Sequence, residues 1–183
     1  MNKKILEILG KGVSVIALSA LMIAPRLLSA HGHHSMGKTS PEFDKIKQLV
    51  GTWGGTTTMM GEKEPMNYTV TYELTAGGTA ILEREFAGSP HEMVSVYYMD
   101  GNHLDVTHYC MMGNQPHMIL DKVSGNTLSF DLEGTSGLAS STVPHMHHLN
   151  LTLVDADHIK QTWTEYEGGK KAHTTVLELT RKS

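Results

Sequence analysis

The sequence predicts an all-β protein, an antiparallel up-and-down barrel of about ten strands with one short helix before the first strand. Three observations carry this prediction. Tyr68, Val70, Tyr72 and Leu74 alternate with polar residues, which is the period of a half-buried strand. No second helical segment is long enough for a parallel crossover, which excludes parallel α/β folds. Turn-forming residues recur between short apolar or alternating runs, at Gly77-Gly78, Gly88-Ser89-Pro90, Asp100-Gly101-Asn102, Gly113-Asn114, Gly125-Asn126, Asp155-Ala156-Asp157 and Gly168-Gly169.

The one predicted helix spans residues 41–50. Ser40 offers a side-chain cap for its first turn, and Pro41 suits the first helical position. Apolar residues then follow at helical spacing, at Phe43, Ile46, Leu49 and Val50.

The N-terminus has the features of a secretory signal peptide. A basic start at Lys3 and Lys4 precedes an apolar run over residues 13–24, and Leu28-Ser29-Ala30 supplies small residues before a polar stretch. We therefore expect an exported protein, periplasmic or secreted, without a stable membrane span once the signal is removed. An uncleaved membrane anchor is the alternative. The expected segments are a signal peptide at 1–30, a flexible His-containing leader at 31–40 and a barrel domain at 41–183.

Charge and cysteine content exclude several classes of function. The whole chain has 15 Lys and Arg against 19 Asp and Glu, and the residues after position 30 carry 11 basic and 18 acidic side chains. An acidic chain without a Lys/Arg run lacks the electrostatic footprint of a nucleic-acid-binding protein. Cys110 is the one cysteine in the sequence, so an intrachain disulfide and a Cys-rich zinc site are excluded.

The first predicted strand begins in the segment Leu49-Val50-Gly51-Thr52-Trp53-Gly54-Gly55. A short helix followed by a Gly-x-Trp strand and a strand meander resembles the calycin superfamily, which includes lipocalins, fatty-acid-binding proteins and the nitrobindin-type haem barrels. The motif Gly-Thr-Trp-x-Gly is most similar to that of the nitrobindin-like members. The resemblance implies a lipocalin-like barrel over residues 41–183 that holds a small hydrophobic or amphipathic ligand, with haem as one candidate. From the residues themselves, Gly51 allows a sharp turn and Trp53 can plug one end of the barrel.

Several polar residues fall on strand faces that we expect to point into the barrel. His108 shares a face with Leu104, Val106 and Cys110, for example. Polar groups inside an apolar barrel must pair with one another, with water or with a ligand. The predicted ligand-binding residues are Tyr72, Arg84, His108, His145, His147, Gln161, Trp163, Glu165 and His173.

The position of Arg84 bears on the expected charge of the ligand. It shares a face with Ala80, Leu82 and Phe86. If that face is internal, the buried guanidinium needs an acid such as Glu165 or an anionic ligand such as a fatty-acid carboxylate or a haem propionate. A structural salt bridge is the alternative.

Three classes of function remain open from the sequence. The first is a binding module for an apolar or amphipathic molecule, with His108, His145 or His147 as a possible haem ligand. The second is an enzyme on the same scaffold, with His108 as general base and Glu165 or Cys110 assisting. The third is a protein that handles copper or nickel. Against each stands a structural role, in which His108 is a hydrogen-bonded core residue, Cys110 an inert thiol, and the histidines at 145 and 147 a solvated rim.

The hypothesis of a copper- or nickel-handling protein gives a prediction for the N-terminus that signal-peptide cleavage would leave. Cleavage after Ala30 leaves His31-Gly32-His33-His34, in which the α-amine, two deprotonated amides and the His33 imidazole form a square-planar donor set for Cu(II) or Ni(II), with His31 and His34 as further donors. We predict that Cu(II) titration of the mature protein gives the visible band of four-nitrogen copper. Acetylation of the amine or His33→Ala should abolish it, and a band that survives both changes would place the copper elsewhere.

Overall fold

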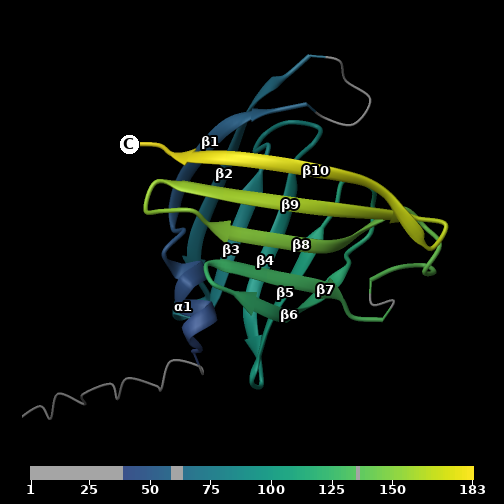
Figure 1. Ribbon diagram of the computed structural model, residues 1–183, viewed down its shortest axis with the longest axis horizontal. Coiled ribbons are helices and arrows are strands. Elements are labelled where there is room, and N and C mark those ends of the chain that lie inside the picture. Colours follow the sequence, from purple (N-terminus) through teal and green to yellow (C-terminus); the bar gives the residue numbers. More distant parts are fainter. Residues whose placement is uncertain (1–38, 59–63, 135–136) are drawn as a thin grey trace, which may run out of the picture. The chain divides into compact units, whose positions relative to one another are not determined.

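The computed structural model describes residues 39–58, 64–134 and 137–183. Its strands close into a barrel in which each strand pairs antiparallel with its neighbours in sequence, and the first pairs with the last (Figure 1). The predicted antiparallel barrel is therefore confirmed. Within the described residues the elements are α1 (Pro41–Lys47), β1 (Gly51–Thr57), β2 (Met66–Thr75), a 3₁₀ turn (Ala76–Gly78), β3 (Ala80–Glu85), β4 (Met93–Asp100), β5 (His103–Tyr109), β6 (His117–Ser124), β7 (Thr127–Leu132), β8 (His145–Leu153), β9 (His158–Glu167) and β10 (Lys170–Arg181).

The helix begins as the sequence predicts and ends earlier. The Ser40 hydroxyl accepts a hydrogen bond from the Phe43 amide and so caps the first turn. Helix α1 ends at Lys47, because the following amides of Leu49 and Val50 bond three residues back and tighten the chain into turns. Gly51 then takes a φ of 131°, a backbone region that favours glycine, and the chain turns into β1.

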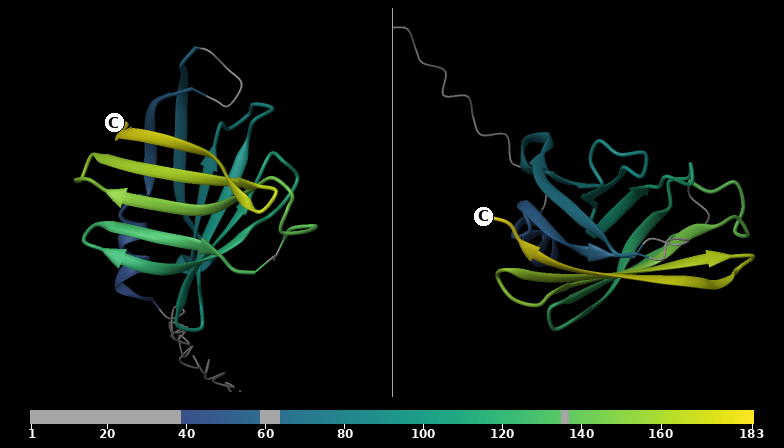
Figure 2. Two further views of the ribbon diagram at one scale, coloured as in Figure 1. Left: turned by 45° about the vertical axis from the view of Figure 1, so that its right-hand side comes forward. Right: turned by 90° about the horizontal axis from the view of Figure 1, so that it is seen from above.

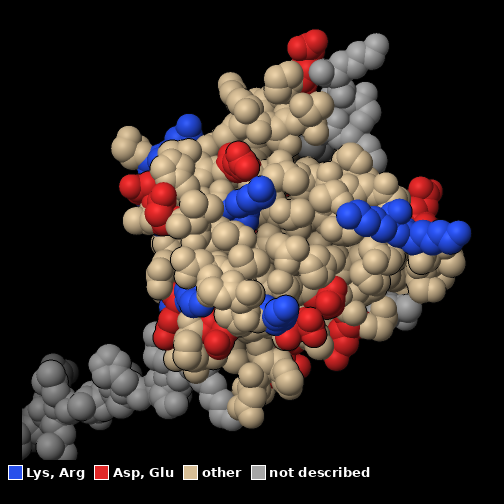
Figure 3. All heavy atoms as spheres, in the orientation of Figure 1, with Lys and Arg blue, Asp and Glu red and all other residues tan. Residues whose placement is uncertain are grey.

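The interior lies between two walls of strands. In the view from above in Figure 2, the yellow-green strands β9 and β10 form one wall, and the blue and teal strands β2 to β5 face them. Apolar side chains from both walls fill the space between, among them Val70, Ile81, Val106, Phe130, Leu149, Ile159 and Leu177. The face shown in Figure 3 carries acidic and basic side chains interspersed. No helix in the described part of the chain is long and apolar enough to cross a membrane.

One end of the barrel is closed by Trp53 and Arg181. The indole of Trp53 is buried and donates from Nε1 to the Leu49 carbonyl at 2.7 Å. The Arg181 guanidinium lies 4.1 Å from the centre of the Trp53 ring and donates to the carbonyls of Gln48 and Val50. Residues from the helix exit, the first strand and the last strand are thereby joined, and the predicted plug at Trp53 is confirmed.

We predict that Arg181→Ala lowers the free energy of unfolding by about 2 kcal/mol, because it removes a cation–π contact and three charge-assisted hydrogen bonds, to the carbonyls of Gln48, Val50 and Ala156. Urea unfolding followed by tryptophan fluorescence measures the change. Arg84→Ala is the matched control, since its exposed pair with Glu92 is expected to contribute less than about 1 kcal/mol. Equal losses in the two variants would contradict the closing role of Arg181.

Candidate functional site

A buried carboxylate organises the middle of the barrel. Glu83 on β3 is fully buried and accepts hydrogen bonds from the hydroxyls of Tyr72 at 2.8 Å and Tyr97 at 2.7 Å. Gln161 on β9 donates from Nε2 to the same carboxylate, and its own Oε1 accepts from Trp163 Nε1 at 2.8 Å. Side chains from both walls therefore converge on one group, and every polar atom of this network is bonded.

Glu85, two residues further along β3, is in a different situation. It is as buried as Glu83, but its Oε1 has no hydrogen-bond partner among the described residues. Burial, with the neighbouring charge of Glu83 added, raises the pKa of Glu85 well above its usual range. Burial also raises the pKa of Glu83, but three donors oppose the shift. The pKa of Glu85 is therefore raised more strongly than that of Glu83, so of the two adjacent carboxyls Glu85 is the one that favours the protonated form.

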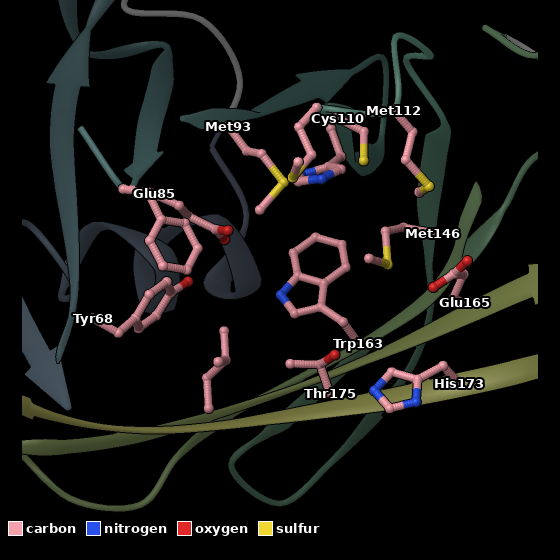
Figure 4. A pocket seen from close by; sticks show the side chains of 14 residues that line it. Tyr68, Glu85, Met93, Cys110, Met112, Met146, Trp163, Glu165, His173 and Thr175 are labelled. Carbon is pink, nitrogen blue, oxygen red and sulfur yellow. The ribbon is translucent and has the colours of Figure 1, made fainter. Parts of the chain in front are cut away.

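Beside this network lies a cavity of about 100 Å³. Figure 4 shows the carboxyl group of Glu85 and the hydroxyl of Tyr68 directed into it, opposite Trp163. Most of its wall is apolar, aromatic or sulfur-containing. The lining residues are Tyr68, Glu85, Phe86, Met93, His108, Cys110, Met111, Met112, Met146, Trp163, Glu165, His173, Thr175 and Leu177.

Three buried polar atoms on this wall have no hydrogen-bond partner in the described part of the chain. They are Tyr68 Oη, Glu85 Oε1 and His108 Nε2. The Tyr68 hydroxyl lies near the Glu85 carboxyl and interacts with it, which lowers the pKa of Glu85 slightly, but the two groups do not form a hydrogen bond of normal geometry. The other ring nitrogen of His108 lies 2.9 Å from the Ser95 hydroxyl, and the ring packs on Trp163 with 4.7 Å between ring centres. Buried polar groups are ordinarily bonded, so three such atoms on one small cavity make it the candidate functional site of the described chain.

Four of the residues predicted from the sequence, His108, Trp163, Glu165 and His173, line this cavity, as does Cys110. Tyr72 and Gln161 lie in the Glu83 network next to it. No hydrogen bond joins the predicted catalytic residues His108, Cys110 and Glu165 to one another in the described chain. Burial raises the pKa of the Cys110 thiol, which disfavours the nucleophilic thiolate.

The expectation that Arg84 faces the interior is wrong. Its side chain is 40% exposed and pairs with Glu92 on the outer surface. The inner residues of β3 are instead Ile81, Glu83 and Glu85. The larger number of apolar residues beside Arg84 suggested the wrong face. The hairpin register held the correct signal, because pairing about Gly77-Gly78 sets Glu83 opposite the inward Tyr72.

His145 and His147 also lie outside the cavity, contrary to prediction. A register shift between Met146 and His148 adds one residue to β8, so Met146 lines the cavity and the two histidines do not, although His145 is buried. The ring of His147 stacks on Tyr166 at 3.8 Å, and His145 Nε2 lies 3.0 Å from His147 Nδ1. A bulge leaves no clear mark in the alternation of polar and apolar residues.

The cavity does not suit the haem expected from the resemblance. His108 Nε2 is a free donor atom, but about 100 Å³ is well below the roughly 300–1,000 Å³ of pockets for drug-sized ligands. No group of three or more His, Cys, Asp or Glu in the described residues is arranged to hold a metal ion. The predicted N-terminal donors His31, His33 and His34 lie outside the described residues.

Comparisons with known proteins support the fold. No family of known sequences matches the chain, and no curated protein matches it. A similar solved structure is a protein of unknown function from the DUF3598 family of Nostoc punctiforme, with 16% identity and a TM-score of 0.51. The match covers 75% of this chain and 49% of that protein, so the chain spans about half its length. At this identity the similarity extends to the barrel fold alone, which is consistent with a calycin-like barrel.

His108 gives the site a predicted pH dependence. Burial lowers its pKa to about 4, against about 6.5 in an unfolded chain. The folded protein excludes a proton that the unfolded chain binds, so this contribution to stability is present above pH 6.5 and is lost as the pH falls toward 4. We predict a loss of about 3 kcal/mol through this group between pH 7 and pH 4.

Urea unfolding at both pH values tests this prediction. The raised pKa of Glu85 acts in the opposite direction, since its contribution is lost as the pH rises, so the effect is read from variants. His108→Gln should reduce the acid-induced loss by about 3 kcal/mol. His158→Gln, at an exposed histidine, should behave as the unmodified protein does. The same loss in all three proteins would refute the assignment.

Proposed function

We propose that this protein is an exported, calycin-like binding barrel that holds one small molecule in the cavity beside Glu83. The main support is the set of three buried atoms without a regular hydrogen bond, Tyr68 Oη, Glu85 Oε1 and His108 Nε2, on a wall that is mostly apolar. Leaving such groups unbonded costs about 1–3 kcal/mol each, and a ligand with matching polar atoms restores that energy.

The volume of the cavity limits the ligand's size. An apolar cavity of about 150 Å³ holds benzene, so about 100 Å³ suits a molecule of only a few heavy atoms, or a somewhat larger one that extends past the mouth. The mouth is formed by exposed parts of Met111, Met112 and His173. Met side chains adapt their shape readily, which allows modest expansion.

The ligand is therefore small and amphipathic rather than a long-chain lipid or haem. Its apolar part meets the rings and sulfur atoms, and its polar part meets Tyr68, Glu85 and His108. A fatty-acid carboxylate is disfavoured, because no Lys or Arg is among the lining residues and Arg84 lies on the outer surface.

Methionine-methyl NMR with benzyl alcohol as the probe tests this proposal. We expect saturable shifts at Met93 and Met146, which line the cavity, and none at Met118, which is buried elsewhere. Thr175→Leu should fill part of the cavity and weaken the shifts. The matched change Val176→Leu, on the exposed face of the same strand, should leave them intact.

Two outcomes would overturn the proposal. One is an equal shift at Met118, which would indicate general partitioning into the core. The other is unchanged binding in Thr175→Leu, provided its spectrum shows the folded barrel. A rise in melting temperature with probe concentration, lost in Thr175→Leu, is the independent check.

A further inference from the structure

The cavity is acidic and lacks a basic counterpart. Glu85 and Glu165 are among its lining residues, and the carboxylate of Glu83 lies directly behind the wall on the same strand face as Glu85. No Lys or Arg is among the lining residues. His108 is neutral because burial lowers its pKa to about 4. The electrostatic field inside therefore favours a cation.

Aromatic rings stand next to the unpartnered carboxyl. The rings of Tyr68 and Phe86 are 4.5 Å apart between centres, and Trp163 lies across the cavity. Phe86 reaches this position with a φ of 51°, a strained conformation for a residue with a bulky side chain. Strain of this kind gathers at functional sites, and aromatic faces beside a carboxylate bind organic cations.

Resting on the proposed function, we propose that the ligand is a small primary ammonium ion with an apolar body. An ammonium group has three N–H donors and no acceptor. The wall offers three buried atoms that can accept: Glu85 Oε1, Tyr68 Oη and, when His108 Nδ1 donates to Ser95, His108 Nε2. The number and polarity of the unpartnered atoms match the donors of the cation.

Binding also moves one proton. The raised pKa of Glu85 favours its protonated form in the free protein, and the arriving ammonium favours the carboxylate, so the proton leaves to solvent while the ligand keeps its own. Affinity should therefore rise with pH until Glu85 ionises in the free protein or the amine loses its proton. The other titratable groups around Glu85 are Glu83, Tyr68, Tyr72, Tyr97, His108, Cys110, Glu165 and His173.

Three isosteric probes separate the ligand classes: benzylamine, benzyl alcohol and benzoate, titrated by calorimetry at pH 7.5. We expect benzylamine to bind at least tenfold more tightly than benzyl alcohol, and benzoate more weakly than either. Titration in buffers of different ionisation enthalpy should show about one proton released with benzylamine and none with benzyl alcohol.

Glu85→Gln keeps the shape of the side chain and removes the charge. It should abolish the preference for benzylamine and the proton release while leaving benzyl alcohol binding within about threefold. Glu92→Gln, which alters an acid on the outer surface, is the control and should retain the full preference. Because Glu85→Gln also removes a buried ionisable group, loss of folding is not expected.

The outcomes distinguish this inference from the proposed function. If none of the three probes binds, the proposed function itself fails. If benzyl alcohol binds and benzylamine binds no better, or if Glu85→Gln retains the preference, only the ammonium assignment fails. Tight Cu(I) binding that displaces benzyl alcohol, without a preference for the amine, would assign the cavity to a soft metal through its sulfur atoms and would also overturn the inference.

Discussion

The carboxylate of Glu83 is the interaction around which the interior of this barrel is arranged. It lies in a space where an unbonded charge would be prohibitively costly, and three donors from β2, β4 and β9 offset that cost. Gln161 comes from the opposite wall and is held in turn by Trp163. The network therefore fixes the distance between the walls, the orientation of Trp163 and the position of the cavity that Trp163 lines. Glu85 has only the nearby Tyr68 hydroxyl, against three donors for Glu83, and the different chemistry of the two carboxyls follows from this difference.

The two ends of β10 differ in role: one end closes the barrel, and the other lines the candidate cavity. Arg181, at the end of β10, packs on Trp53 and bonds to carbonyls at the exit of α1, which seals one end. His173, Thr175 and Leu177, near the start of the same strand, line the cavity. Under the proposed function, a ligand would enter past His173, away from the end that Trp53 and Arg181 close. The seal and the site lie one strand length apart and share no residue, so changes at either should be nearly additive in stability.

The sequence contained the fold and about half of the site. Strand alternation and regularly spaced turns predict the barrel, because each strand buries one face and each turn needs special residues. The same alternation correctly placed His108, Gln161, Trp163 and Glu165 on inner faces. It failed at β3, where the outward face carries more apolar residues than the inward one, and at β8, where a bulge reverses the alternation. The inward face of β3 can be found from the sequence by the pairing register. Tyr72 and Glu83 are equally distant from the turn at Gly77-Gly78, so they pair across the hairpin and share a face. The bulge at His147 needs the structure.

Reversing the face of β3 also reverses the expected charge of the ligand. With Arg84 inside, the barrel would attract an anion such as a fatty acid, whereas with Glu83 and Glu85 inside it repels one. The raised pKa of Glu85 disfavours two adjacent negative charges in the empty cavity, because the hydrogen-bond donors that stabilise a carboxylate converge on Glu83. The barrel can therefore be stable without a ligand, while Glu85 can still ionise when a cation lies beside it. Under the proposed ammonium binding, selectivity depends on whether the incoming group stabilises the negative charge that forms when Glu85 loses its proton. A neutral molecule does so only weakly, and an anion opposes it.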